Sequence, residues 1–221
     1  MVYRIEIGLK NGVPDARGRK IRQQADEILG ISFNSCLTRD IYKISANINS
    51  IQADQIKKIF SDPVISNSAL DRLPFDHPFD WLIEVGFKPG VADNLGRTAR
   101  GALQDVIGRE LDWEEQVYTS IQYFISGNIE RSLVEKLGYD LLANKLIHDV
   151  VIFSNKEWTL SKPDLLTPVF KNKVDVKVST YELPDDDKEL VRISNEGILS
   201  LSLEEMRAIR DHYLDENVKK Y

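Results

Sequence analysis

The sequence predicts an α+β fold in which one βαβαβ unit occurs twice. Residues 5–30 recur as residues 83–108, 78 positions later, and 11 of the 26 aligned positions are identical. Each copy starts with alternating apolar residues, at 3–9 or 81–87, which is the pattern of a half-buried strand. A glycine turn and an amphipathic helix follow. Both copies should therefore adopt the same structure, and we expect antiparallel sheets with helices packed on them.

The residues that both copies retain indicate what the unit requires. Asp15 is predicted to cap the first helix, because its carboxylate can accept the free backbone N–H groups of the first turn. Gly30 is placed to end that helix in the left-handed conformation, and Gly18 allows close packing of the backbone. The retained residues of the first copy are Ile5, Glu6, Gly8, Lys10, Gly12, Val13, Asp15, Gly18, Arg19, Arg22 and Gly30.

The two copies resume their correspondence after a loop of unequal length. Residues 42–48 match residues 123–129 at an offset of 81, so three extra residues lie around 109–116. Both matching segments are rich in β-branched and aromatic residues, which favours strands. Second helices are predicted near 53–60 and 133–143, and each leads into a last strand.

The repeat divides most of the chain into two predicted domains. The first unit spans residues 1–73 and the second spans residues 79–155. The run from Leu73 to Pro78 joins them as a stiff linker, because proline fixes φ and cannot donate a ladder hydrogen bond.

The remaining residues do not belong to the repeat. We expect residues 156–200 to be a mostly irregular connector with one strand at 174–178, and residues 201–221 to contain a helix. Ser202 and Glu205 have the spacing of a capping box at its start. The helix carries a sparse apolar stripe that needs a surface to pack on: Met206, Ile209 and Tyr213.

Composition favours a soluble cytoplasmic protein that binds neither nucleic acid nor membrane. The chain has 221 residues, with 29 Lys and Arg against 35 Asp and Glu, and a formal net charge of −6. An acidic chain lacks the basic footprint of a nucleic-acid-binding protein. No apolar run approaches the ~20 residues of a membrane span, and the N-terminus lacks the layout of a signal peptide. A single cysteine fits a reducing compartment.

The sequence offers few groups for catalysis. Cys36 is expected to be a packing residue, as buried free cysteines usually are. His77, His148 and His212 share no metal-ligand spacing, and the acidic run 185–187 is expected to be solvated. We therefore expect no catalytic residue and no metal or cofactor bound by this chain. The alternative of a cysteine or metal enzyme would require turnover by the isolated chain.

The glycine turn before the first helix raises a second alternative. Residues 12–20 lie between a strand and a helix, where phosphate-binding loops also lie. The spacing departs from that of a P-loop, which has four residues between its glycines, followed by Lys and Ser or Thr. Helix N-termini attract anions, so a weak anion site at Arg19 or Arg97 stays open. The simpler interpretation is structural.

Longer motifs carry a resemblance to a known family. Residues 83–99 read Ile-Glu-Val-Gly-Phe-Lys-Pro-Gly-Val-Ala-Asp-Asn-Leu-Gly-Arg-Thr-Ala. This run resembles the signature of the PurS family, small subunits of phosphoribosylformylglycinamidine synthase, a glutamine-dependent enzyme of de novo purine synthesis. Residues 141–149 resemble the run that closes a PurS domain, so two PurS-like units cover about residues 1–155. Residues 201–213 resemble the linker segment that opens the synthetase subunit, PurL.

The resemblance implies a non-catalytic structural subunit or N-terminal module of that synthase. PurS dimers bridge the synthetase to the glutaminase, PurQ, and help form the ammonia route, so the two units here would form a pseudo-dimer. ATP and Mg²⁺ are expected only on the partner synthetase, and further homo-oligomerisation stays open. A ferredoxin-like regulatory protein that binds a small molecule is the alternative. The expected assembly residues are Lys10, Gly12, Asp15, Arg19, Arg22, Lys88, Gly90, Asp93, Arg97, Arg100, Met206, Ile209 and Tyr213.

Overall fold

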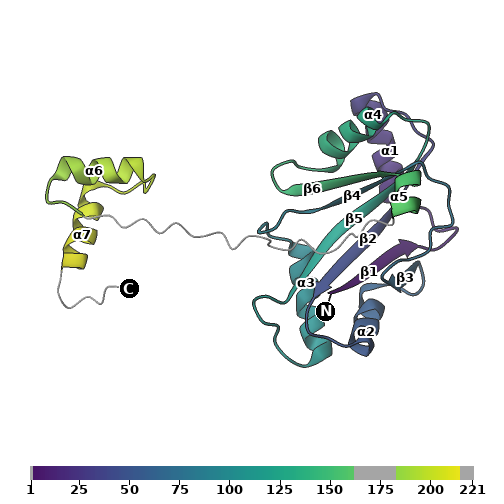
Figure 1. Ribbon diagram of the computed structural model, residues 1–221, viewed down its shortest axis with the longest axis horizontal. Coiled ribbons are helices and arrows are strands. Elements are labelled where there is room, and N and C mark those ends of the chain that lie inside the picture. Colours follow the sequence, from purple (N-terminus) through teal and green to yellow (C-terminus); the bar gives the residue numbers. More distant parts are fainter. Residues whose placement is uncertain (1, 162–182, 215–221) are drawn as a thin grey trace. The chain divides into compact units, whose positions relative to one another are not determined.

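The computed structural model describes residues 2–161 and 183–214 (Figure 1). The chain divides into two compact units, residues 1–171 and residues 172–221. The first unit contains both sequence copies, and the second contains a pair of helices. The strand expected at 174–178 lies outside the described residues. In the described part of the chain, no helix is both long and apolar enough to cross a membrane.

The first unit is a six-stranded antiparallel sheet with helices. Its strand order is β3-β1-β2-β5-β4-β6. The first copy consists of β1 (Val2–Leu9), α1 (Ala16–Leu29), β2 (Ser35–Ser45), α2 (Ser50–Phe60) and β3 (Ser66–Leu70). The second consists of β4 (Trp81–Phe87), α3 (Asn94–Ile107), β5 (Gln116–Ser126), α4 (Arg131–Leu137), a π-helical turn (Gly138–Leu142) and β6 (His148–Ser154), and α5 (Asn155–Ser161) follows.

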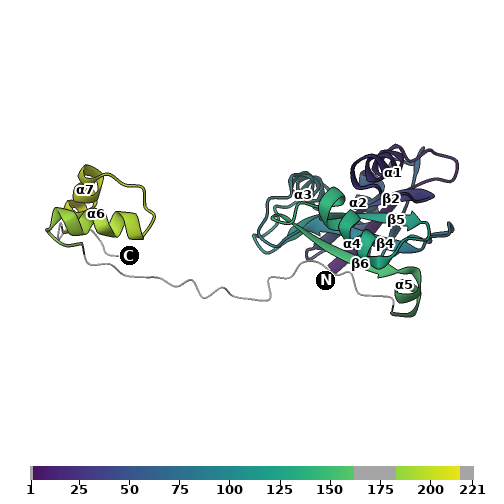
Figure 2. The same cartoon turned by 90° about the horizontal axis from the view of Figure 1, so that it is seen from above.

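The helices of the two copies share one face of this sheet. Figure 2 shows α1, α2, α3 and α4 on that face and α5 on the other. The ring of Trp158 in α5 lies 5.8 Å from that of Phe153 in β6, on the face away from the other helices. Each copy has the predicted order βαβαβ.

The two copies meet at the centre of the sheet. β2 and β5 pair antiparallel, with Ser35 opposite Ser126 and Ser45 opposite Gln116. Because the copies are offset by 81 residues in this region, Asp40 lies opposite Ile121, its own counterpart. The strand order consequently reads the same from either edge when each strand is replaced by its counterpart in the other copy.

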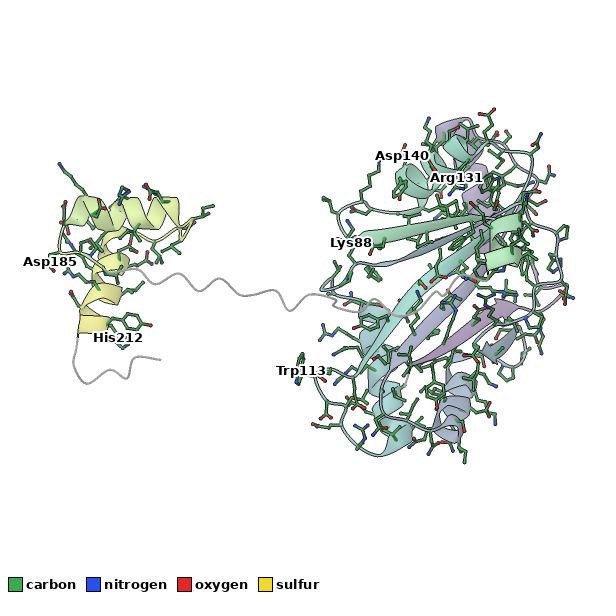
Figure 3. All side chains as sticks on the ribbon, in the orientation of Figure 1. Lys88, Trp113, Arg131, Asp140, Asp185 and His212 are labelled. Atoms are coloured by element: carbon green, nitrogen blue, oxygen red, sulfur yellow. The ribbon has the colours of Figure 1, made fainter. Side chains whose placement is uncertain are left out.

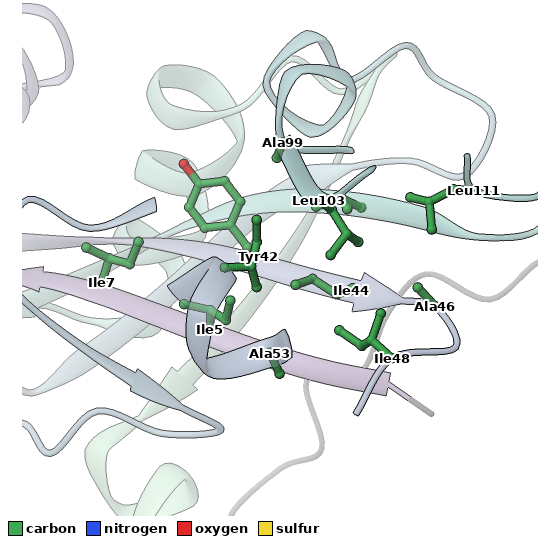
Figure 4. Close-up of a cluster of buried hydrophobic side chains, with 12 residues drawn as sticks. Ile5, Ile7, Tyr42, Ile44, Ala46, Ile48, Ala53, Ala99, Leu103 and Leu111 are labelled. Atoms are coloured by element: carbon green, nitrogen blue, oxygen red, sulfur yellow. The ribbon is translucent and has the colours of Figure 1, made fainter. Parts of the chain in front are cut away.

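The buried side chains form two hydrophobic clusters, and each cluster draws on both copies. In the first, Ile5 and Ile44 of the first copy lie with Leu103 of α3 (Figure 4). In the second, Ala25 of α1 lies with Ile83 of β4 and with side chains of β5 and α4. The first helix of each copy therefore completes the core of the other copy, and neither copy has a full core of its own.

The predicted helix ends are confirmed. Asp15 accepts a hydrogen bond from the backbone N–H of Gly18 at 2.6 Å, and Asp93 does the same for its own helix at 2.7 Å. Gly30 and Gly108 end the helices with φ of +67° and +68°, a conformation that glycine adopts without strain.

The middle strands begin earlier than the sequence indicates. We expected strands at 42–48 and 123–129, whereas β2 begins at Ser35 and β5 at Gln116. The added part of β2 contains Thr38, Arg39 and Asp40, which obscure the alternation of a strand. These side chains nevertheless have partners on both faces: Arg17 bonds Thr38 and Asp40 on the helix face, and Arg39 pairs with Glu6 on the other.

The second unit consists of α6 (Asp187–Glu196) and α7 (Leu203–Leu214). The capping box at α7 is confirmed, because Ser202 and Glu205 exchange hydrogen bonds at 2.7 and 3.3 Å. Helix α6 lies where we expected an irregular connector. It forms because Asp186 caps its first turn through the backbone N–H of Lys188 and because Leu190 is fully buried. Part of the acidic run thus has a structural role.

Candidate functional site

The retained aspartates link each first helix to the middle strand of its copy. Besides capping α1, Asp15 accepts hydrogen bonds from the backbone N–H and the hydroxyl of Thr38, at 2.6 and 2.8 Å. Asp93 makes the same pair of bonds to Thr119, at 2.7 and 2.8 Å. These threonines were not among the residues predicted from the sequence, although their recurrence at an offset of 81 could have identified them. The aspartates thus fix the position of each helix on the sheet.

The retained glycine of the first turn allows that close approach. A Cβ at Gly18 would lie 1.9 Å from the carbonyl oxygen of Cys36, and one at Gly96 would lie 2.4 Å from that of Val117. These contacts are far too short, and the obstructing atoms belong to the backbone. The expected structural role of this glycine is confirmed.

The retained lysines hold the turn that precedes each edge strand. Lys10 Nζ donates to the carbonyl of Pro63, and its backbone N–H donates to Ile65. Lys88 makes the equivalent bonds to the carbonyls of Lys145 and Ile147. Gly12 and Gly90 lie beside these lysines with φ of +89° and +85°. In the described structure, both pairs stabilise the unit internally.

The second retained arginine of each copy holds the loop before its middle strand. Arg22 donates to the carbonyl of Asn34 at 3.2 Å. Arg100 donates to the counterpart carbonyl of Glu115 at 3.0 Å, and also to the carbonyls of Leu111 and Asp112. These arginines therefore shape loops that belong to their own copies.

Among the charged residues retained in both copies, Arg19 and Arg97 differ from the others. Both side chains are exposed on the first helices. Neither guanidinium has a hydrogen bond or ion pair with any residue of 2–161 or 183–214. Their retention in both copies has no explanation in the internal structure of the unit.

The stripe predicted on the last helix is divided by the structure. Met206 is buried within the second unit, whereas Ile209 is half-buried and Tyr213 is exposed. Arg207 pairs with Asp187, which connects α7 to α6. Tyr213 is therefore the most exposed of the three side chains.

A buried ionic network lies on the sheet face away from α1–α4. Glu6 and Glu84, which are counterparts, are 1% and 3% exposed. Arg4 joins them, with nitrogen–oxygen distances of 2.8 Å to Glu6 and 3.0 Å to Glu84. Arg39 pairs with Glu6 at 3.1 Å, and Lys43 pairs with Glu84 at 2.6 Å. The network connects the two copies across the sheet.

The charges of this network favour a structural role. Burial would raise the pKa of Glu84, but Lys43 and Arg4 outweigh burial and lower that pKa from 4.5 to about 2. A carboxylate with this pKa stays ionised near neutral pH and is a poor general base. Gln122 donates to Glu84 at 2.9 Å, while its own buried Oε1 lacks a partner among the described residues.

The linker between the copies is bound to the network. Arg39 donates to the carbonyls of Leu73 and Pro74 at 2.6 and 2.5 Å. Phe75 stacks on Phe124 of β5, with ring centroids 3.8 Å apart. Arg39 lies over the Phe75 ring, 4.8 Å from its centroid. The linker is therefore fixed on the sheet and packs against the Arg39 end of the network.

A cavity of about 330 Å³ lies between the first glycine turn and this linker. Its lining includes Lys10, Gly12, Arg39 and Asp76. His77 also lines it, with Nε2 3.0 Å from the side-chain oxygen of Asn11. Leu37, Leu73 and Phe75 add apolar groups to the lining. Small-molecule sites combine an apolar lining with a few polar groups in this way.

Cys36 is placed as a packing residue. It is buried in the second hydrophobic cluster, where burial raises the pKa of its thiol to about 12. A thiol with this pKa is a poor nucleophile. Among the residues that the structure describes, no group of three or more His, Cys, Asp and Glu is placed to hold a metal ion.

Comparison with known proteins adds no assignment to this geometry. No protein-family model matches the chain, and no curated protein matches it significantly.

Proposed function

We propose that this chain is a non-catalytic, PurS-like assembly module of phosphoribosylformylglycinamidine synthase, acting in the cytoplasm. In this proposal, two PurS-like units form a pseudo-dimer within one chain. The module bridges a PurL-type synthetase and a PurQ-type glutaminase, and the C-terminal helix pair contacts the synthetase. ATP and Mg²⁺ would bind to the synthetase alone.

The proposal rests on the resemblance of residues 83–99, 141–149 and 201–213. The observation that carries it furthest is that both hydrophobic cores are shared between the copies about the β2–β5 pair. A duplicated unit that can complete its core only with another copy has the construction of a dimer joined into one chain. The roles of the retained residues agree with this, since nearly all of them cap, pack or hold loops.

The test is assembly with purified partners. The chain is mixed with a PurL-type synthetase and a PurQ-type glutaminase from the same organism, each supplied as a separate protein without this module. We expect the three to co-elute in gel filtration in the presence of glutamine and ATP–Mg²⁺. Separate elution of the chain at micromolar concentrations would refute the proposal.

The cavity at the first glycine turn favours a second candidate, a regulatory protein that binds a small polar molecule. The glycine turn would then be a ligand loop, with Lys10 and His77 as contacts. A metabolite that binds the folded state raises the melting temperature. A thermal-shift screen of phosphorylated and carboxylated metabolites, repeated with Lys10→Met, distinguishes the candidates: a shift that the variant abolishes supports the sensor.

A further inference from the structure

Two surface hollows occupy equivalent positions in the two copies. The Arg19 hollow is lined by Arg19, Arg22, Gln23, Asp26, Ser32 and Phe33. The Arg97 hollow is lined by Arg97, Arg100, Gly101, Gln104, Trp113 and Gln116. The first four residues of each are counterparts at an offset of 78, and Trp113 is the counterpart of Ser32 at an offset of 81. The two hollows thus share a position in the unit and a pair of arginines, while their other lining residues differ.

The arginines are the retained element of these hollows. Where the exposed faces of α1 and α3 align, most residues differ, including Lys20 against Thr98 and Gln23 against Gly101. Arg22 and its counterpart are used to hold loops. Arg19 and Arg97 have no internal partner in the described structure, so their retention is best explained by a contact outside the chain.

The Arg97 hollow has a positive charge that its own lining does not neutralise. Arg100 donates only to neutral oxygens, namely backbone carbonyls and the side chain of Gln104. None of the six lining residues is acidic, whereas the Arg19 hollow contains Asp26. A free guanidinium fork matches a carboxylate in shape and charge.

Trp113 adds an apolar contact beside Arg97. Its side chain is 81% exposed and projects from the loop before β5 (Figure 3). The three extra residues of the second copy lie in this loop. Arg100 on α3 donates hydrogen bonds to the loop carbonyls of Leu111 and Asp112. The indole is thus presented on a loop that is anchored to α3.

This composition suits a protein partner better than a small ligand. Tryptophan and arginine are the residues that most often dominate the binding energy of protein interfaces. A small-molecule site encloses most of its ligand, whereas the indole here is largely open to solvent.

We propose that the Arg97 hollow is a docking site for a partner segment that presents a carboxylate beside an apolar side chain. Arg97 pairs with the carboxylate, and Trp113 packs on the apolar side chain. This inference rests on the proposed function for the identity of the partner. Because the C-terminal helix pair is assigned there to the synthetase, the partner at the Arg97 hollow is the glutaminase.

The test compares variants of the full chain in binding to each purified partner by calorimetry. Arg97→Glu and Trp113→Ala should each weaken binding to the glutaminase by about tenfold or more. Weaker binding to the synthetase alone would overturn the inference. Lys20→Glu is the matched control, because it makes an identical charge change at an exposed, unretained position and should leave affinity within about twofold. Circular dichroism and thermal unfolding check that each variant is folded.

The outcomes distinguish failure of the docking site from failure of the proposed function. If the unchanged chain binds a partner and both variants bind it as tightly, the Arg97 hollow is not the docking site, although the proposed function stands. If the unchanged chain binds neither partner, the proposed function fails and this inference fails with it. Equal loss of affinity in Lys20→Glu would also refute the inference, since it would indicate a general charge effect.

Discussion

At the scale of single residues, the repeat gives several structural roles a second instance. Asp15 and Asp93 make the same bonds, as do Lys10 and Lys88. The sequence therefore offers internal controls that a chain without a repeat lacks. Substitutions at two residues, Gly18 and Glu84, give predictions about stability.

Gly18→Ala should destabilise the protein strongly, because the new Cβ would meet the Cys36 carbonyl oxygen at 1.9 Å. We expect a loss of about 3 kcal/mol or more in the free energy of unfolding, measured by urea denaturation. Gly101→Ala is the control in the interior of α3, where an added Cβ meets no atom within 4 Å. It should stabilise by about 0.5–1 kcal/mol. Similar losses in both variants would contradict the packing shown by the structure.

Glu84 should contribute to the loss of stability in acid. Its folded-state pKa of about 2 lies below the ordinary 4.5. Its contribution is therefore complete above the ordinary value and is lost as the pH falls towards 2, by roughly 3 kcal/mol in total. Denaturation of the unchanged chain and Glu84→Gln at several pH values tests this.

At neutral pH, Glu84→Gln should lose about 3–5 kcal/mol, because Lys43 then lies buried without its carboxylate. The free energy of unfolding of this variant should also fall less steeply than that of the unchanged chain as the pH is lowered. Asp54→Asn, which alters an exposed ion pair with Lys57 and Lys58, should have no measurable effect. A variant that keeps the full acid dependence would show that Glu84 is not its source.

At the scale of elements, the first helices are fixed by polar anchors as well as by packing. Asp93 caps α3 and binds Thr119 of β5 at the same time. An ordinary N-cap residue contributes only to its helix, as Asn49 does at α2 through its capping box with Gln52. This difference gives a measurable contrast between two caps.

Asp93→Ala should cost more than Asn49→Ala. Loss of a cap costs about 1 kcal/mol, and the buried Thr119 N–H left without an acceptor adds about 1–3 kcal/mol. We therefore expect about 1 kcal/mol for the Asn49 variant and about 2–4 kcal/mol for the Asp93 variant by chemical denaturation. Equal costs would mean that the link from α3 to β5 contributes nothing.

The sequence predicted these elements unevenly, for physical reasons. Caps, glycine turns and first strands follow local rules, so residues such as Asp15 and Gly30 identified them. The start of β2 was missed because Arg39 and Asp40 are polar strand residues that tertiary partners satisfy. Helix α6 was missed because its apolar stripe is short. Trp113 was missed as a surface feature because periodicity does not indicate exposure in a loop.

At the scale of the whole first unit, each core contains residues of both copies. The sequence predicted two units but not that their first helices contribute to shared cores. Local patterns fix an element and its apolar face, whereas the register of β2 with β5 decides which sheet region each helix covers. The ionic link from Arg4 to Glu84 depends on the same register.

Cutting the chain within the linker should therefore leave neither copy able to fold as a monomer. We expect fragments 1–76 and 77–161 to be unfolded or self-associated when separate, and to recover the native circular dichroism spectrum when mixed. Sedimentation equilibrium measures the state of each fragment. A fragment that is monomeric and melts cooperatively by itself would contradict the shared cores.

The central claim, that this chain assembles a synthase without performing its chemistry, is tested most directly by reconstituted activity. ATP consumption is measured for the PurL-type synthetase and PurQ-type glutaminase together, with the amidine-forming substrate and either glutamine or ammonia as nitrogen source. We predict that adding the chain raises the glutamine-dependent rate at least about tenfold, because assembly raises the effective concentration of glutamine-derived ammonia at the synthetase. The rate with added ammonia should be unchanged. A glutamine-dependent rate that is the same with and without the chain would contradict the account.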